Sequence, residues 1–233
     1  MKVLVLLSGG IDSTTCLALA IEKHGRENVE AISFNYGQKN IKELAHAKEI
    51  CKFYHVNLIE MDISKLFSFS KKCAMLSHNN LELSHQTYDK QFENLKENEN
   101  VISNVPFRNG IMLSICAGYA IENNLSKIYY GIHREEGIAY DLYPDCSTEF
   151  NKSMNEAIIA GSGRKVEIEA PLCNLSKREI IKLAVDKNVP LDLTWTCYDN
   201  EELACGLCNS CTDRIKAFKE LGLIDPIKYR RLT

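Results

Sequence analysis

Residues 3 to 15 predict a buried strand, a tight turn and the start of a helix, and they read Val3-Leu4-Val5-Leu6-Leu7-Ser8-Gly9-Gly10-Ile11-Asp12-Ser13-Thr14-Thr15. The apolar run that ends at Leu7 indicates a short strand, and a helix is expected from Thr14 to Glu22. Two adjacent glycines let main-chain N–H groups approach an anion closely. The helix that follows directs unpaired N–H groups and a partial positive charge toward the same point. The stretch therefore predicts a phosphate-binding loop.

The loop contains no lysine, so it is not the G-x-x-x-x-G-K-[ST] loop of many nucleotide-binding proteins. Its motif S-G-G-x-D-S resembles the pyrophosphatase-type loop (PP-loop) of enzymes that cleave ATP between the α and β phosphates and transfer AMP. The resemblance implies that the Ser8 and Ser13 hydroxyls hold pyrophosphate and that Asp12 helps to hold Mg²⁺. It implies an ATP site made by Leu7, Ser8, Gly9, Gly10, Ile11, Asp12, Ser13 and Thr14. The alternative is a plain turn in which serine and aspartate cap a helix.

Length and composition predict a soluble globular protein. A chain of 233 residues fits one large domain, or one domain with a small appendage. No apolar run nears the roughly 18 residues that a membrane span needs. The net charge of −3 gives no sign of a nucleic-acid partner. Because Met1-Lys2-Val3 leads into a strand rather than a signal peptide, a cytoplasmic location without membrane attachment is expected.

The pattern after the loop predicts a β-α-β-α-β order with parallel strands, because strand-like segments at 29–34 and 56–61 flank a helical segment at 39–54. Further strands are expected at 127–132 and 165–170, with helices at 111–123, 149–160 and 177–187. The expected fold class is α/β, a doubly wound, mostly parallel sheet similar to adenine nucleotide alpha hydrolases. We expect residues 1–190 to form one ATP-binding domain, with its ligands beyond the carboxyl ends of the strands.

Between residues 64 and 104 the periodic pattern weakens and polar residues dominate. Two interpretations are open. The segment is either a long mobile insertion on the surface or a lid that orders over the nucleotide.

Four of the ten cysteines are clustered near the C-terminus with the spacing C-x7-C-x2-C-x2-C. Without an export signal disulfides are not expected. Four thiolates predict a structural Zn²⁺ site, whose ligands would be Cys197, Cys205, Cys208 and Cys211. Free thiols and an iron–sulfur cluster are the alternatives, although the C-x3-C-P ending of bacterial ferredoxins is missing. Residues 191–233 are therefore predicted to be a small zinc-binding tail with a short helix.

Motifs along nearly the whole chain together resemble the 7-cyano-7-deazaguanine synthase family of queuosine precursor synthesis. They are S-G-G-x-D-S, F-N-Y-G-Q, V-P-F-R-N, Y-P-D-C, P-L-x-x-L-S-K, T-W-T-C-Y and C-G-L-C-N-S-C-T-D-R. The resemblance implies an ATP-dependent C–N ligase that converts 7-carboxy-7-deazaguanine and ammonia to the 7-cyano base. It implies two adenylations, first of the carboxylate and then of the amide. It also implies Mg²⁺, one structural zinc ion and a homodimer.

The resemblance also assigns residues outside the loop. Catalytic roles are implied for Ser8, Asp12, Ser13, Arg108 and Lys177, with Lys177 neutralising charge on phosphate. Nucleotide contacts are implied for Tyr36, Gln38 and Asn109, and acceptor contacts for Arg108, Asp145 and Glu149. A carboxylate at position 145 matches two adjacent donors of a deazaguanine. Each has a plain alternative: a surface ion pair for Arg108, an ordinary first-turn lysine for Lys177 and a turn residue for Asp145.

One departure from the family pattern lies next to the expected base pocket. The family reads Y-P-D-C-R-P-E-F, whereas Cys146 is followed here by Ser147 and Thr148. A relative that adenylates another carboxylate therefore stays open. Two further hypotheses are a tRNA-thiolating enzyme with a cysteine-bound cluster and a nucleotide-binding module without catalysis. The absence of a basic excess disfavours the first, and the intact Ser8, Asp12 and Ser13 disfavour the second.

Overall fold

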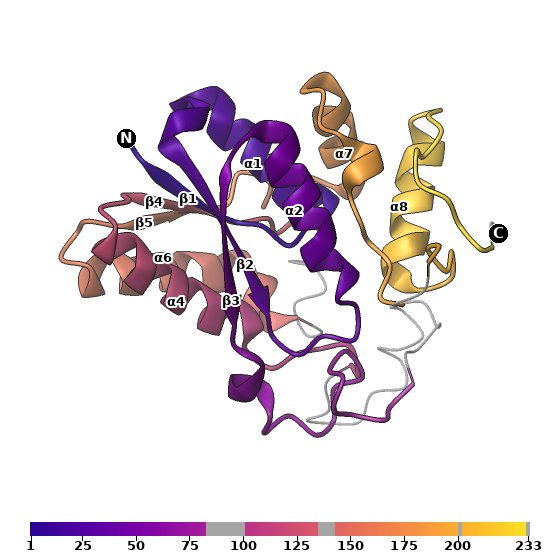
Figure 1. Ribbon diagram of the computed structural model, residues 1–233, viewed down its shortest axis with the longest axis horizontal. Coiled ribbons are helices and arrows are strands. Elements are labelled where there is room, and N and C mark those ends of the chain that lie inside the picture. The colour runs from indigo at the N-terminus through magenta and orange to yellow at the C-terminus, as the bar shows by residue number, and fades with distance from the viewer. Residues whose placement is uncertain (83–100, 135–142, 200–201, 232–233) are drawn as a thin grey trace.

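The computed structural model describes residues 1–82, 101–134, 143–199 and 202–231, and these contain a five-stranded sheet with helices on both faces (Figure 1). The strands are β1 (Val3–Leu6), β2 (Val29–Asn35), β3 (Asn57–Asp62), β4 (Lys127–Tyr129) and β5 (Glu167–Glu169). The α-helices are α1 (Ile11–His24), α2 (Lys42–Tyr54), α4 (Arg108–Glu122), α6 (Thr148–Gly161), α7 (Lys177–Asp186) and α8 (Asn209–Glu220). Short 3-10 helices are η1 (Arg26–Asn28), η2 (Ser64–Phe67), η3 (Pro144–Cys146) and η4 (Leu191–Leu193).

All neighbouring strands are parallel, and their order across the sheet is β3-β2-β1-β4-β5. Val3 of β1 lies opposite Val29 of β2 on one side and opposite Lys127 of β4 on the other. The chain thus winds outward from β1 to β3 and then outward again from β4 to β5. This confirms the predicted doubly wound α/β fold. In such sheets ligands bind where the strand order reverses, which here is between β1 and β4.

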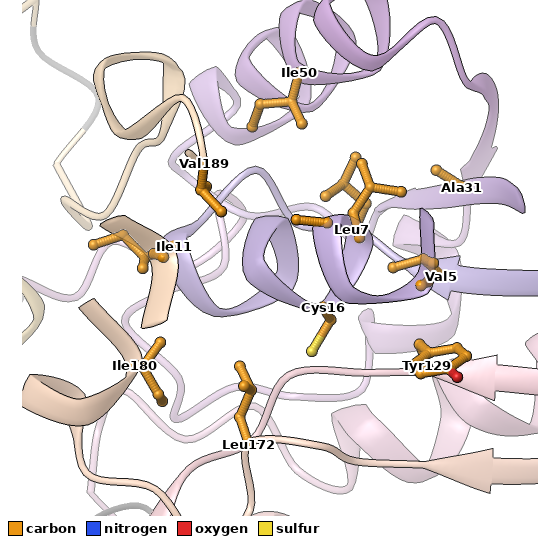
Figure 2. Close-up of a cluster of buried hydrophobic side chains, with 14 of the residues drawn as sticks. Val5, Leu7, Ile11, Cys16, Ala31, Ile50, Tyr129, Leu172, Ile180 and Val189 are labelled. Atoms are coloured by element: carbon orange, nitrogen blue, oxygen red, sulfur yellow. The ribbon is translucent and has the colours of Figure 1, made fainter. Parts of the chain in front are cut away.

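The central strand β1 is buried on both faces, as parallel strands covered by helices are. Val3 and Val5 point into one apolar cluster, whereas Leu4 points into a second cluster on the opposite face. The first cluster packs the sheet against α1, α2 and α7, and Figure 2 shows Val5, Leu7 and Cys16 within it. The second packs it against α4 and α6 on the other face (Figure 1). The two layers hold the carboxyl ends of the strands in place.

Two helices begin three residues earlier than the periodic pattern predicts. Helix α1 begins at Ile11 rather than at Thr14, because the extended Gly10 acts as its N-cap and accepts a 3.0 Å hydrogen bond from Thr14 N. Asp12 therefore lies in the first turn of α1. Helix α4 begins at Arg108 rather than at residue 111, because a distant carboxylate caps its first turn. Periodicity cannot detect either cause, since both depend on groups that carry no apolar signal.

The segment 64–104 is only partly described, because residues 83–100 lie outside the described residues. Its first part packs on the sheet: Phe67, Met75 and Leu76 are buried in the second cluster. Ser77 N donates to Gly37 O at 2.7 Å, which ties this part to the end of β2. Both interpretations of segment 64–104, a mobile insertion or a lid, depend on residues 83–100, which lie outside those described, so both stay predictions.

The C-terminal segment packs against the α/β layers. Helix α8 lies beside α7, and its Ala217 and Phe218 complete the first apolar cluster (Figure 1). A third, smaller cluster gathers Trp195 with the four C-terminal cysteines. Within the described ranges, none of the helices combines the length and the hydropathy that crossing a bilayer requires.

Candidate active site

The PP-loop joins β1 to α1, and its two serines hold it closed. Ser8 N donates to Ser13 Oγ at 3.1 Å, and the two hydroxyl oxygens are also 3.1 Å apart. Ser13 Oγ in turn donates to Gly10 O at 3.2 Å. The side chains of Leu7, Ile11 and Thr14 are buried beneath the loop. Because those three side chains point inward, any nucleotide contact they make is through the main chain, at the N-terminus of α1.

Two glycines let other parts of the chain touch this loop. Gly9 has φ of +85°, and a Cβ there would lie 2.5 Å from Glu43 O of α2. Gly131, which follows β4, would place a Cβ 2.9 Å from the carbonyl carbon of Asp12. Real Cβ atoms do not approach backbone that closely, so neither position accepts a side chain without a shift of the loop. The loop is therefore held between α2 and the exit of β4.

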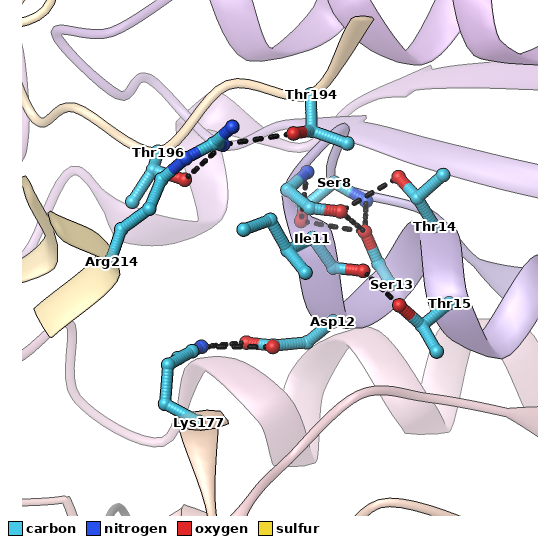
Figure 3. A network of polar contacts seen from close by, with 11 residues as sticks. Ser8, Ile11, Asp12, Ser13, Thr14, Thr15, Lys177, Thr194, Thr196 and Arg214 are labelled. Carbon is cyan, nitrogen blue, oxygen red and sulfur yellow. Dashed lines mark hydrogen bonds and ion pairs between the residues drawn. The ribbon is translucent and has the colours of Figure 1, made fainter. Parts of the chain in front are cut away.

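Lys177 reaches the loop from the first turn of α7 and pairs with Asp12 (Figure 3). Its Nζ lies 2.8 Å from Oδ1 and 2.6 Å from Oδ2 of that carboxylate. Burial raises the pKa of Asp12, but the charges of Lys177, His133 and Arg214 outweigh it and hold the pKa below its ordinary value. The capping box of Ser176 and Glu179 fixes the helix end that carries the lysine. A lysine at a helix N-terminus, which the dipole disfavours, is explained by this pairing.

A second group of ionisable side chains surrounds Arg108 at the start of α4. Arg108 Nη1 donates to the Tyr36 hydroxyl at 3.3 Å, and its guanidinium lies 5.4 Å from the Tyr36 ring centre. Burial disfavours the cation, but Tyr36, Asp145, Cys146 and Glu43 hold the pKa of Arg108 above its ordinary value. Burial raises the pKa of Tyr36 to about 12, so that phenol stays neutral. Arg108 is therefore a permanent cation between the ends of β2 and α6.

Glu43 in the first turn of α2 is a site residue that sequence reasoning missed. Burial raises its pKa to about 7, against the lowering effects of Arg108 and of a hydrogen bond with Asn40. Asn40 is buried, and among the described residues its Oδ1 has no hydrogen-bond partner. A carboxylate whose pKa is moved so far by its surroundings is a candidate for proton transfer. The sequence shows only an acid in a first helical turn, where the dipole alone explains it.

Asp145 and Asn109 bind each other rather than lying free. Asp145 Oδ2 accepts from Asn109 N at 2.8 Å, and Asn109 Nδ2 donates to Asp145 O at 3.0 Å. Asp145 is thus the carboxylate that caps α4 and sets the position of Arg108. Glu149 is exposed in the first turn of α6. Ser147 caps that helix by accepting from Phe150 N at 3.0 Å, which gives this departure from the family pattern a local structural role.

The turn after β2 uses Gln38 to hold itself together. Gln38 Oε1 accepts from Tyr36 N at 2.9 Å, and its Nε2 donates to Phe34 O at 3.3 Å. Both ends of the buried amide are therefore bonded within its own turn, and the side chain supports Tyr36 beside Arg108. Tyr36 itself is buried against Phe67, with ring centres 6.0 Å apart.

The four C-terminal cysteines form a buried cluster whose sulfur atoms all lie within 4.8 Å of one another. Cys205 Sγ and Cys211 Sγ are 3.9 Å apart, close to the separation of about 3.8 Å that tetrahedral bonds of roughly 2.3 Å to zinc require. Main-chain N–H groups of Cys205 and Cys208 donate to the sulfurs of Cys197 and Cys205. The residues therefore fit a tetrahedral metal site that needs thiolates.

A PP-loop α/β protein is the class that this sheet and loop define. The family model described as "Queuosine biosynthesis protein QueC" matches residues 2–222. A 7-cyano-7-deazaguanine synthase of Thermoplasma volcanium is 41% identical over 236 residues, covering 99% of this chain and 91% of the relative. One of Acetivibrio thermocellus is 41% identical over 237 residues, covering 100% and 99%. The chain therefore belongs to the QueC family of queuosine biosynthesis.

Solved structures of more distant proteins share the fold alone. The U34-tRNA thiolase NcsA of Methanococcus maripaludis, with its [4Fe-4S] cluster, superposes with a TM-score of 0.53 at 16% identity, covering 95% of this chain and 67% of that one. The NMN synthetase of Francisella tularensis gives 0.52 at 17% identity, covering 96% and 73%. At such identities the matches support the α/β fold and say nothing about the substrate.

Proposed function

We propose that this chain is an ATP-dependent ligase that converts 7-carboxy-7-deazaguanine and ammonia to 7-cyano-7-deazaguanine. Full-length similarity to synthases of that name carries the proposal, together with a PP-loop whose two serines and aspartate are placed at the switch point of the sheet. The tRNA-thiolating alternative rests on the shared fold and on cysteines that could also hold an iron–sulfur cluster.

The proposed reaction has four steps. The substrate carboxylate attacks the α-phosphorus of ATP, pyrophosphate leaves and an acyl adenylate forms. Ammonia attacks the carbonyl carbon, AMP leaves and a proton is released with the amide. The amide oxygen attacks a second ATP and releases pyrophosphate and a proton. AMP then leaves with that oxygen while the last N–H proton is lost and the nitrile forms.

In this proposal the PP-loop binds the pyrophosphate portion of ATP. Ser8 and Ser13 donate hydroxyl hydrogen bonds to it, and the main-chain amides at the start of α1 face its charge. Lys177 exchanges part of its pairing with Asp12 for the phosphates and neutralises the charge that develops there. Mg²⁺, when bound, offsets phosphate charge, and the ionised Asp12 offers the oxygen ligand that it prefers.

The substrate that is adenylated, 7-carboxy-7-deazaguanine, would lie next to Arg108, on the side of Tyr36 and Asp145. The permanent positive charge of Arg108 attracts the substrate carboxylate and the phosphate beside it. Asn109 and Asp145 fix the start of α4, and Asp145 together with Glu149 remains our proposal for contacts to the base. Ammonium needs hydrogen-bond acceptors. The Glu43 carboxylate and Asn40 Oδ1 are two acceptors beside the ionisable side chains around Arg108, and we propose that they bind it.

The cysteine cluster is proposed to hold one structural zinc ion, in keeping with the 3.9 Å sulfur separation and with thiols in a reducing cytoplasm. We also propose a homodimer, which rests on the resemblance to the family, and we suggest the exposed adjacent pair Leu223 and Ile224 as part of its interface. Light scattering measures the dimer, and elemental analysis separates zinc from iron.

Mass spectrometry of the product tests the function. Incubation with the carboxy-deazaguanine, ammonium and Mg-ATP is expected to yield the amide and then the nitrile, with two AMP formed for each nitrile. The variant Ser13→Ala is expected to lose AMP formation while keeping the fold. Formation of AMP without either product would refute the proposed acceptor, and absence of AMP would refute the proposed ligase.

A further inference from the structure

Trp195, the single tryptophan of the chain, lies between the PP-loop and the cysteine cluster. Its main-chain N–H donates to Gly9 O at 2.9 Å. A Cβ at Gly10 would lie 3.5 Å from Trp195 O, so the two backbones run side by side. Residues from opposite ends of the chain thus share the turn that faces the nucleotide.

The same residue is bonded to a cysteine of the cluster. Trp195 Nε1 donates to Cys197 O at 3.0 Å, and Asn40 Nδ2 donates to the same carbonyl at 2.5 Å. Cys197 thus belongs to the segment that is bonded to the PP-loop, whereas the other three cysteines of the cluster belong to the segment 205–211. A metal ion that binds all four sulfurs therefore fixes the position of the Cys197 backbone relative to that second segment.

Side chains on both flanks restrict how the segment 194–197 can move. On one flank, the Trp195 ring stacks on His46 of α2 with ring centres 5.2 Å apart, and Lys42 Nζ lies 5.0 Å from its centre. On the other flank, the buried Arg214 donates to Thr194 Oγ1 at 2.8 Å and Thr196 Oγ1 at 3.2 Å (Figure 3). A displacement at Cys197 is therefore transmitted to Gly9 rather than absorbed by a loose linker.

We infer that Trp195 is a positioning residue that couples metal binding by the cysteine cluster to the conformation of the PP-loop, so that loss of the metal weakens nucleotide binding. The coupling rests on the proposed ATP site and the proposed metal site. The metal then does more than fold the tail. With the ion bound, Cys197 would be fixed, and Trp195, which is bonded both to Cys197 O and to Gly9 O, would limit the movement of the PP-loop backbone.

Intrinsic fluorescence tests the coupling directly, because all tryptophan emission comes from Trp195. A non-hydrolysable ATP analogue with Mg²⁺ is titrated into zinc-loaded protein and into protein stripped by a chelator, with circular dichroism to show that the sheet and helices remain. We expect the analogue to change Trp195 emission in the loaded protein. We expect its Kd to rise at least about tenfold on stripping and to recover on adding zinc. An equal Kd in both forms, or unchanged emission, would overturn the inference.

Variants keep the test decisive if stripped protein unfolds. Trp195→Phe retains the stack on His46 but removes the Nε1 donor to Cys197 O. Its Kd for the ATP analogue, measured by calorimetric titration, is expected to rise about threefold to tenfold, the loss of roughly one hydrogen bond, with unchanged zinc content. Cys173→Ser, outside the cluster, is the matched control and should change neither. A Trp195→Phe protein whose Kd for the analogue is unchanged, with or without loss of zinc, has only a structural tryptophan, and the inference fails.

These readouts need no acceptor substrate. Failure of the nitrile assay therefore leaves the coupling standing, and failure of the coupling leaves the proposed ligase standing.

Discussion

Replacing Glu43 with glutamine is expected to stabilise the protein at pH 8 while it impairs the use of ammonium. The carboxylate is partly buried beside Arg108, and burial holds its pKa at about 7. Glutamine has nearly the same shape and resembles the protonated acid. The variant therefore removes a charge whose burial destabilises the fold. It also replaces one of the two carboxylate oxygens proposed to accept from ammonium with an N–H donor.

The size of the effect follows from the two pKa values. The folded pKa of about 7 lies above the ordinary 4.5 of the unfolded chain, so between these values the native state binds more protons. The free energy of unfolding must then fall as pH rises through this window. A difference of this size corresponds to at most about 3 kcal/mol at pH 8, and the partial exposure of Glu43 reduces it to roughly 1–2 kcal/mol. Near pH 4.5 the effect should almost vanish.

Urea unfolding at several pH values from 4.5 to 8 measures this difference between Glu43→Gln and the parent protein. Glu49→Gln is the matched control, because Glu49 is an exposed residue of the same helix that pairs with Lys52. The control should change stability by less than about 0.5 kcal/mol at every pH. The KM for ammonium, measured at saturating ATP, should rise at least about tenfold in Glu43→Gln alone.

Two results would refute this reasoning. If Glu43→Gln destabilises the protein at pH 8, the carboxylate is stabilised by its neighbours and burial does not dominate its pKa. If stability changes as expected but the KM for ammonium stays the same, the Glu43 carboxylate destabilises the fold but does not bind ammonium.

Three further changes are predicted from the contacts of the site. Lys177→Gln should lower the free energy of unfolding by about 1–3 kcal/mol, because the partly buried Asp12 carboxylate loses its cation, and should lower kcat for AMP release at least about hundredfold. Calorimetry and AMP assays measure the two effects, and Lys182→Gln, an exposed lysine on the same helix, should change neither. Gly131→Ala should raise the Kd for an ATP analogue at least about tenfold in calorimetric titration, because its Cβ meets the PP-loop backbone, and an unchanged Kd would contradict the packing. Asp225→Asn should destabilise the protein by about 3–5 kcal/mol in thermal unfolding, since it leaves the fully buried Arg214 without its counter-charge, and a loss below about 1 kcal/mol would show that the pair is not essential.

The sequence predicts most of the fold because its signals are local. The apolar run of β1, the S-G-G-x-D-S turn and the alternation of strand and helix each lie within a few residues. The cysteine cluster is predicted for the same reason, since C-x2-C-x2-C places three thiols on one turn, and Gly206 has the positive φ of +75° that this turn needs.

The parts that sequence reasoning missed depend on residues far apart in the chain. The first turn of α4 is capped by a carboxylate 36 residues away, so its start could not be read from periodicity. The pKa of Glu43 is set by burial and by Arg108, neither of which is visible in the acid's own neighbourhood in sequence. Trp195 gave a motif for the family but no indication that its N–H bonds to Gly9. A lone glycine after a strand, as at Gly131, is the one signal that could have pointed to close backbone approach.

The pairing of Asp12 with Lys177 has a consequence for how the protein is made. The two residues are 165 positions apart, so a ribosome delivers the loop long before the lysine that neutralises it. Trp195 emerges later still. Until then a nascent chain carries the strand, the turn and the first helix without the contacts that complete the site. At the proposed ATP site, nucleotide would therefore bind only after these late residues have emerged, and its binding free energy would add to the stability of completed chains alone.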